Sequence, residues 1–457
     1  MGADFEKRKA TCFQQNPSLD APEELADESE DCLTLNVYAP TSCKSIGRPV
    51  LVWIYGGNLQ SGYSGNPIFD GSGFAANHNI LVVTFNYRLN AFGFSNSPEL
   101  PLVQRNVGFL DQRLALQWVQ DNIHKFGGDP DQITIAGESS GASSVDRLVN
   151  LPPKGLPFRA AAAESGQATV SGFARNSGPK SWETLVMSLN CSSADSELAC
   201  VQDADPQTIR DIVNEGNLDF SPVNDNVTQA ATPYLEARAG GNAAKVPFFT
   251  GTTAQEGTIL SLVYNLDILD FSQEQLEQYL TLLTGGDAQL ISQFQGLIQA
   301  IQQTDGLSLF YAAAQAYTEL VYQCPARLLT IASVESGVPT WRYYYNATFP
   351  NTQPEGHTGL GAYHVSDLRL IWGTYPEENA TAEEIALSKS IQTSWAGFVK
   401  DPWGEGPGWE QVDVSGAGLA CLGCNGSANP TMLDEGVIDG RCLYYQEIYD
   451  NTSTPFF

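Results

Sequence analysis

Basic residues are scarce in this chain of 457 residues, which has 23 lysines and arginines against 52 aspartates and glutamates, a formal net charge of −29. Such a surface repels phosphate backbones, so we do not expect nucleic acid as a partner. Long apolar runs are missing too, because the longest, such as residues 50–55 and 80–85, fall far short of the roughly 18 to 20 residues that span a bilayer. Hydrophobic residues nevertheless make up 42 % of the chain, enough for a full core. We expect a folded globular protein without a membrane span.

Histidine is rare, with four in the chain, and none lies near Cys421, Cys424 and Cys442. This weakens a zinc interpretation of those three cysteines. The nine cysteines instead indicate an oxidising compartment. Six Asn-x-Ser/Thr sequons add mild support for secretion, at Asn190, Asn226, Asn346, Asn379, Asn425 and Asn451. The first residues contain no apolar signal core, so we expect a secreted protein whose signal segment is not part of this chain.

Short β-rich runs alternate with helical patterns along the chain. The predicted strands lie at residues 50–55, 80–86, 132–137, 244–250 and 340–345. Apolar side chains recur at helical spacing over residues 110–126, and Gly127 ends that pattern. Strands that alternate with helices predict a mostly parallel sheet covered by helices. A segment rich in Gln, Leu and Ala at 273–334 predicts an inserted helical subdomain, which we place at about 258–340 within a single domain of residues 1–457.

The sequence GESSG at residues 137–141 matches the G-x-S-x-G pattern of a nucleophile elbow. The bare pattern is weak, but here it follows an apolar strand and precedes a helical run at 142–148. Glycines at both flanks permit the sharp turn that exposes a serine hydroxyl at a helix N-terminus. We therefore predict Ser139 as a nucleophile rather than part of an ordinary strand-to-helix turn.

A serine hydroxyl needs a base to take its proton, and an acid to orient that base. Of the four histidines, His364 lies in a loop before an apolar run and follows Ser139 in the chain order expected of an α/β-hydrolase. The acid should then lie between these two residues, at the end of a strand. Glu256 meets this condition, although a solvated surface glutamate is the alternative on spacing alone.

A tetrahedral intermediate also needs amide donors for its oxyanion. The loop Gly56-Gly57-Asn58 directly follows a predicted strand and offers exposed N–H groups. The N–H of Ser140, next to the nucleophile, adds another donor. A glycine pair after a strand is otherwise a simple turn.

Several segments together resemble the type-B carboxylesterase/lipase family, the cholinesterase-like branch of the α/β-hydrolases. They lie in the family's order at residues 30–37, 52–57, 86–89, 106–128, 137–141, 251–257 and 361–367. The resemblance implies an α/β-hydrolase fold with helices on both faces of a mostly parallel sheet. It implies that the protein hydrolyses esters without a metal or an organic cofactor.

The resemblance also implies individual roles. Ser139, Glu256 and His364 would form the catalytic triad, and Gly57, Asn58 and Ser140 the oxyanion hole. Ser165 and Asp367 would lie beside the buried acid. The pairs Cys12–Cys32 and Cys191–Cys200 would be the family's two usual disulfides, whereas Cys43, Cys324, Cys421, Cys424 and Cys442 have no assigned partners.

The chain departs from the family in three places. Asn58 replaces a third glycine, which asparagine tolerates better than other residues because it visits left-handed backbone. Ser140 replaces an alanine, which leaves the backbone N–H unchanged. The family also has a few dozen further residues before this start, so we expect either a shortened gene product or a variant with an exposed sheet edge.

The loop between Cys12 and Cys32 bears on the substrate. Residues 13–31 contain no tryptophan that would bind a choline group by cation–π attraction, so we do not expect a cholinesterase. The loop is short and acidic, which suits dissolved esters better than triglyceride interfaces. We expect a serine carboxylesterase that acts on a small-molecule ester. The alternatives are an acyltransferase or lactone-forming enzyme with the same triad, and a catalytically silent binding protein. The sequence does not indicate the oligomeric state.

Overall fold

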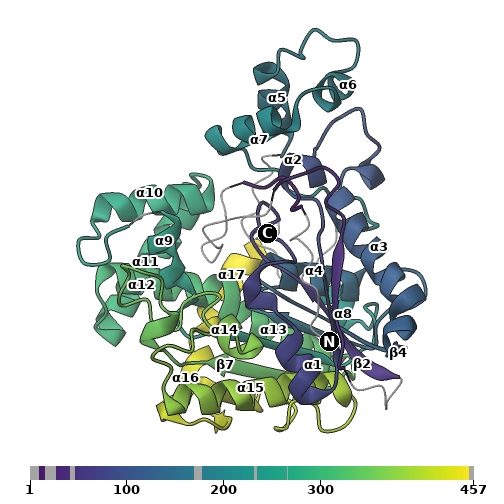
Figure 1. The fold of residues 1–457 in the computed structure, drawn as a ribbon. Helices are drawn as coiled ribbons and strands as arrows, with labels where there is room; N and C mark the ends of the chain where they lie inside the picture. The colour runs from purple at the N-terminus through teal and green to yellow at the C-terminus, as the bar shows by residue number, and fades with distance from the viewer. Residues whose placement is uncertain are drawn as a thin grey trace. The chain divides into compact units, whose positions relative to one another are not determined.

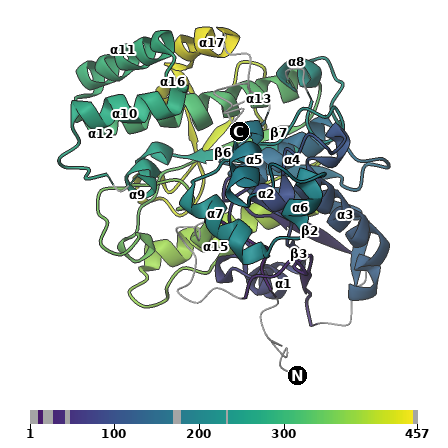
Figure 2. The same ribbon diagram turned by 90° about the horizontal axis from the view of Figure 1, so that it is seen from above.

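Runs of β-branched, aromatic and small residues form the strands of two units into which the chain divides. The computed structural model describes residues 10–15, 27–41, 47–168, 178–230, 234–264 and 266–451. Unit 1 comprises Met1–Arg159 and Arg175–Thr232, and unit 2 comprises Ala160–Ala174 and Pro233–Phe457. Figures 1 and 2 show the ribbon in two views.

The described part of unit 1 has strands in the order β1-β3-β2-β4. They are β1 (Leu35–Tyr38), β2 (Arg48–Ile54), β3 (Leu81–Phe85) and β4 (Gly128–Glu138). β2 pairs in parallel with β3 and with β4, whereas β1 runs antiparallel to β3. β3 is buried at every residue and β2 at all but one, as expected of strands inside an α/β sheet.

The helices of unit 1 follow these strands. They are α1 (Ser72–His78), α2 (Asn90–Gly93), α3 (Val107–Asn122), α4 (Ser140–Asn150), α5 (Gly178–Ser188), α6 (Glu197–Gln202) and α7 (Pro206–Glu215), with 3-10 turns at Pro67–Phe69, Leu102–Gln104 and Ile123–Phe126. α4 is buried at every residue and packs against β4 and β2. The start of α4 is therefore fixed against the carboxyl ends of these strands.

Unit 2 has described strands in the order β5-β6-β7-β8-β9, parallel except for the last pair. They are β5 (Ala160–Glu164), β6 (Phe248–Thr253), β7 (Thr340–Tyr345), β8 (Leu419–Leu422) and β9 (Thr431–Leu433). The helices are α8 (Tyr234–Ala239), α9 (Leu260–Val263), α10 (Gln273–Thr284), α11 (Ala288–Asp305), α12 (Leu309–Tyr317), α13 (Cys324–Glu335), α14 (Leu368–Trp372), α15 (Ala382–Lys400), α16 (Gly436–Asp439) and α17 (Cys442–Asn451). 3-10 turns lie at Glu256–Ile259, Pro350–Thr352 and Cys424–Gly426, and a π-helix lies at Thr318–Gln323.

The segment predicted as a helical insertion contains α9 to α13. Helices α10, α11 and α12 lie side by side in both views (Figures 1 and 2). Leu280, Phe294 and Leu320 are among the buried residues of their shared core. In the chain these helices follow β6 and precede β7, and these two strands pair with each other in unit 2.

Most predicted elements are present, with shifted ends. The predicted strand 340–345 coincides with β7, and α3 begins three residues before the predicted helix 110–126. The predicted strand 244–250 was placed too early, because β6 begins at Phe248, directly after Pro247, which has no N–H to give to a ladder. β5 was not predicted, since its sequence AAAAE has no β-branched residue.

Both disulfides that the resemblance implied are present, Cys12–Cys32 and Cys191–Cys200. Two further disulfides join Cys324 to Cys442 and Cys421 to Cys424, so none of these four sulfurs is free for zinc. Within the described residues, no group of His, Cys, Asp and Glu side chains is arranged to hold a metal ion. Cys43 and most of the predicted acidic loop, residues 16–26, lie outside the described part of the chain. No helix in the described residues has the length and apolarity to cross a membrane.

Candidate active site

Ser139 lies in a sharp turn between β4 and α4, as the GESSG pattern predicts. Its backbone has φ 56° and ψ −123°, a strained conformation for a residue with a side chain. The flanking glycines permit it: a Cβ on Gly141 would lie 2.1 Å from the carbonyl oxygen of Ile54, and a Cβ on Gly137 would lie 2.6 Å from the backbone of Gly141. The turn therefore holds Ser139 at the N-terminus of a buried helix.

The predicted oxyanion loop lies against this turn within unit 1. A Cβ on Gly56 would lie 3.0 Å from the Cβ of Ser139 and 2.8 Å from the carbonyl oxygen of Glu138. Gly57 and Asn58 have φ of 104° and 57°, so both adopt left-handed backbone. Among the described residues, none accepts a hydrogen bond from the backbone N–H of Gly57, Asn58 or Ser140. Within unit 1, the loop that contains Gly57 and Asn58 thus lies beside the turn that contains Ser139 and Ser140.

Glu256 and His364 form a buried pair in unit 2. The Oε2 atom of Glu256 is 2.7 Å from Nδ1 of His364. The other carboxylate oxygen, Oε1, accepts hydrogen bonds from the Ser165 hydroxyl at 2.6 Å and from the Thr253 N–H at 2.7 Å. Glu256 is 0 % exposed and His364 is 8 % exposed. A carboxylate with three donors fixes the ring orientation and favours the tautomer that carries its proton on Nδ1.

The loop that carries His364 is attached to the loop that carries Glu256. The Gln255 N–H donates to the carbonyl oxygen of Ala362 at 2.9 Å, and the Gln255 side-chain oxygen accepts from the Ala362 N–H at 2.7 Å. The Thr258 hydroxyl donates to the carbonyl oxygen of Leu360 at 2.6 Å. Sequence reasoning missed Gln255 and Thr258, because nothing in their spacing marks a contact with a loop about 100 residues away.

Backbone strain accompanies the pair of Glu256 and His364. Val365, the residue after His364, has φ 73°, and Ser165 has φ 48°. A β-branched residue in this region is uncommon, and such strain persists only where surrounding contacts hold it. Strained positions of this kind gather at active sites, where geometry outweighs stability.

Asp367 lies in the same buried region as Glu256. The Tyr343 hydroxyl donates to its Oδ2 atom at 3.1 Å. Burial, followed by the nearby charge of Glu256, raises the pKa of Asp367 to about 7 from its ordinary value of 3.8. The carboxyl group therefore keeps its proton under mildly acidic conditions and adds no second full charge beside Glu256.

The π-helix at Thr318–Gln323 contacts the residues around Glu256 and His364. Sequence reasoning also missed this helix. The Thr318 hydroxyl accepts a hydrogen bond from the Gly257 N–H at 2.9 Å. The ring of Tyr322 lies 4.9 Å from the ring of His364. π-Helices are rare and often mark functional regions. The helical insertion therefore contributes directly to the environment of the histidine.

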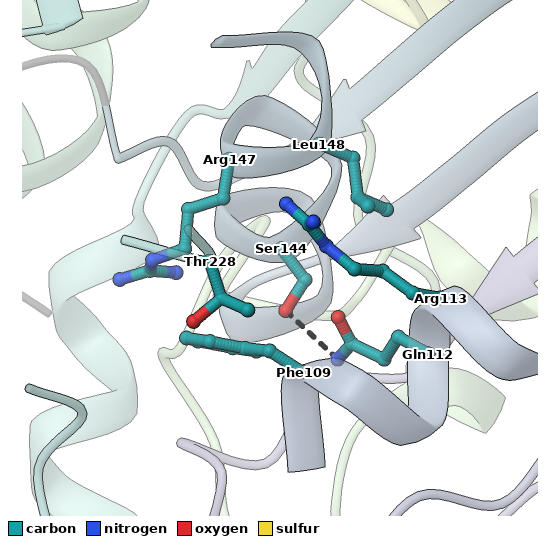
Figure 3. Close-up of a pocket in the computed structure, with 7 residues that line it drawn as sticks. All are labelled: Phe109, Gln112, Arg113, Ser144, Arg147, Leu148 and Thr228. Carbon is teal, nitrogen blue, oxygen red and sulfur yellow. Dashed lines mark hydrogen bonds between the residues drawn. The ribbon is translucent and has the colours of Figure 1, made fainter. Parts of the chain in front are cut away.

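A small cavity in unit 1 contains none of the predicted site residues (Figure 3). It is lined by side chains of α3 and α4 and by one residue of the 178–230 segment: Phe109, Gln112, Arg113, Ser144, Arg147, Leu148 and Thr228. The Gln112 amide donates to the Ser144 hydroxyl at 3.1 Å, and the guanidinium of Arg147 lies 5.0 Å from the ring centre of Phe109. The cavity is a packing gap beside α4 and not the candidate site.

Comparisons with known proteins identify the family of this chain. Residues 3–420 match the model of the Carboxylesterase family. The para-nitrobenzyl esterase of Bacillus subtilis (strain 168) is 33 % identical over 402 residues, which cover 84 % of this chain and 78 % of that protein. Carboxylesterase 1F of Mus musculus is 30 % identical over 416 residues, or 84 % of this chain and 72 % of that protein. Secreted lipase 5 of Gibberella zeae is 29 % identical over 453 residues, or 89 % and 77 %.

A solved structure of PNB esterase has a TM-score of 0.75 and 28 % identity, and covers 96 % of this chain and 88 % of that chain. The predicted fold class, an α/β-hydrolase with a mostly parallel sheet, is confirmed. The chain belongs to the carboxylesterase family, whose members named here hydrolyse carboxylic esters, and it is a carboxylic ester hydrolase.

Proposed function

We propose that this protein is a serine carboxylesterase with Ser139 as nucleophile, His364 as base and Glu256 as the orienting acid. The observation that carries the proposal is the buried bond of 2.7 Å between Glu256 and Nδ1 of His364. A solvated surface glutamate, the alternative considered from spacing, would not be 0 % exposed with three donors. The strained turn at Ser139 supports the role of the nucleophile.

The proposed reaction proceeds through an acyl-enzyme. The Oγ atom of Ser139 attacks the ester carbonyl carbon while Nε2 of His364 takes its proton. The N–H groups of Gly57, Asn58 and Ser140 bind the resulting oxyanion. The imidazolium then protonates the leaving alcohol, and a water molecule repeats the sequence to release the acid. Ester and water are consumed, alcohol and acid are produced, and no cofactor takes part.

Dissolved esters of small molecules are the proposed substrates. The acidic residues of the Cys12–Cys32 loop would bind an oil surface poorly. One relative is named a lipase and another a para-nitrobenzyl esterase, and the proposed substrate class is nearer to the second. An abrupt rise in activity when a triglyceride exceeds its solubility would contradict this assignment.

We further propose that the protein is secreted and carries N-linked glycans. Asn190, Asn226, Asn346, Asn379 and Asn425 are all exposed. The buried asparagines lie outside sequons: Asn66, Asn86, Asn90, Asn96, Asn106 and Asn150. Exposed sequons can carry a glycan without unfolding of the protein. Protein from a eukaryotic secretory host should lose mass with a glycosidase, leaving aspartate at these positions. An unchanged mass would contradict the proposal.

Residues 1–457 are proposed to act as one α/β-hydrolase domain with its helical insertion at about 258–340. The test of the whole assignment is burst kinetics with p-nitrophenyl butyrate on the native sequence, Ser139→Ala and His364→Ala. The native protein should show a burst of p-nitrophenol equal to the enzyme concentration, and both variants should lack it. Equal turnover by a folded Ser139→Ala variant would refute the proposed nucleophile. Product analysis with added alcohol separates hydrolysis from acyl transfer.

A further inference from the structure

The loop after β2 has an unusual backbone that its own sequence does not explain. Gly57, Asn58 and Leu59 have φ of 104°, 57° and 58°, three successive left-handed residues. Glycine adopts this region freely and asparagine tolerates it, but leucine has no polar side chain to offset the steric cost. Groups outside the loop must therefore hold Leu59 in place.

Two hydrogen bonds hold the peptide groups of Leu59. Its N–H donates to the side-chain Oγ of Ser140 at 3.2 Å, and its carbonyl oxygen accepts from the Asn90 N–H at 2.8 Å. Leu59 is 6 % exposed and Ser140 is 4 % exposed, so solvent competes little for these groups. If this buried N–H lost its acceptor, the folded loop would be destabilised by the desolvation of an unpaired donor. The loop would then relax to a shape in which the N–H finds another partner.

The side chain of Ser140 also interacts with Tyr87, near the other end of the loop. Burial and then the nearby Tyr55 phenol raise the pKa of Tyr87 well above its ordinary value, and the Ser140 side chain opposes that rise. The Tyr87 hydroxyl in turn donates to the carbonyl oxygen of Tyr55 at 2.8 Å. Tyr55 directly precedes Gly56. Ser140 is thus bonded to Leu59 at one end of the loop and interacts with Tyr87, which is bonded to the residue before the other end.

We propose that the hydroxyl of Ser140 is a positioning group that holds residues 56–59 in the shape in which the N–H groups of Gly57 and Asn58 meet the oxyanion. The inference rests on the proposed function and adds a second role to Ser140, whose backbone N–H is one of the proposed donors. Gly57 and Asn58 lie between Leu59, to which Ser140 is bonded, and Tyr55, to which Tyr87 is bonded. The strength of an oxyanion hole depends on the distance between its N–H donors and the oxyanion. A loop that no longer holds these donors in place therefore weakens binding of the transition state more than binding of the substrate.

The test compares Ser140→Ala with Ser144→Ala. Both remove a buried hydroxyl from α4, but the Ser144 hydroxyl bonds to the Ser140 carbonyl oxygen and to Gln112, away from the loop. For Ser140→Ala, we expect kcat for p-nitrophenyl butyrate and the affinity for an alkyl trifluoromethyl ketone each to fall about tenfold, with KM changed less than about twofold. The ketone forms a hemiketal with Ser139 whose oxyanion takes the same place. Ser144→Ala should leave both quantities within about twofold of the native values.

A double-mutant cycle with Tyr87→Phe tests whether Ser140 and Tyr87 act together on the loop. If the two side chains act together, the double variant should bind the ketone no more than about twofold worse than Ser140→Ala alone. Additive losses would show independent effects and would overturn the proposal. Ser140→Cys, which keeps side-chain size but is a weak acceptor, should lose at least about threefold in ketone affinity. It serves if the alanine variant does not fold, as judged by its thermal melting.

The outcomes distinguish this inference from the proposed function. The positioning role alone would be overturned if folded Ser140→Ala or Ser140→Cys kept the native kcat and ketone affinity. An equal loss of kcat and ketone affinity in Ser144→Ala would also overturn it. Absence of a burst and of ketone inhibition in the native protein would instead overturn the proposed triad, and the positioning role with it.

Discussion

Replacing Asp367 by asparagine should make the protein progressively more stable, relative to the native sequence, as the pH rises from about 4 to about 8. Burial and the charge of Glu256 raise the pKa of Asp367 to about 7, and its Oδ1 atom has no hydrogen-bond partner among the described residues. Between pH 3.8 and about 7, the folded protein therefore keeps a proton that the unfolded chain has released. Because the folded state binds more protons in this interval, stability falls as the pH rises.

The magnitude follows from that interval. At about 1.4 kcal/mol for each pH unit, the rise from 3.8 to about 7 sets an upper limit of about 4 kcal/mol for the loss. The asparagine side chain of the Asp367→Asn variant would keep an acceptor for the Tyr343 hydroxyl but would not titrate, so this loss should disappear. Any cost of the buried amide would be the same at every pH.

The assay is the free energy of unfolding in urea at pH 4, 5, 6, 7 and 8. The difference between Asp367→Asn and the native protein should grow by several kcal/mol over this range and level off above pH 7. Tyr343→Phe removes the hydrogen bond that lowers the pKa of Asp367. The stability of this variant should therefore continue to decline to a higher pH than that of the native protein. Parallel curves for native protein and Asp367→Asn would refute the reasoning, because they would show that Asp367 titrates alike in both states.

Two further changes probe the structure around the histidine, and a third probes a buried ion pair. Ser165→Ala removes a buried hydrogen bond of 2.6 Å to Glu256 and should cost about 2 kcal/mol of stability in urea, with kcat lowered about tenfold. Gly361→Ala places a Cβ on a residue with φ 67°, 2.5 Å from the Gln255 side-chain oxygen, so kcat and the melting temperature should both fall. An unchanged kcat and melting temperature would contradict the proposed loop contact. Asp439→Asn breaks the buried pair with Arg342 and should cost about 3 to 5 kcal/mol, while kcat per folded molecule stays the same.

Much of the fold could be predicted because its central strands carry local signals. The β-branched runs that became β2 and β3 are buried on both sides, so their composition reflects their place directly. β5 has the opposite character, since its four alanines favour a helix by propensity but form a strand that pairs with β6. The order of strands and the pairing of Cys324 with Cys442, 118 residues apart, depend on long-range contacts that no local pattern contains.

The candidate site divides in the same way. Ser139, Glu256 and His364 could be predicted because family motifs surround each of them. Gln255, Thr318 and Tyr322 were missed because they act through contacts with distant loops. Ser140 could be predicted as an oxyanion donor through its backbone N–H, but no sequence pattern indicates that its side chain bonds to Leu59. Motifs predict which residues react, and the supporting contacts appear only in the folded structure.

The most direct test of the account is peptide mass mapping after treatment with a fluorophosphonate, on the native protein and on His364→Ala. We expect one adduct on the native protein, located on the peptide that contains Ser139, and labelling of the histidine variant slowed by at least about a thousandfold. An adduct on another serine, or labelling at the native rate without His364, would contradict the assignment of Ser139 and His364 as nucleophile and base.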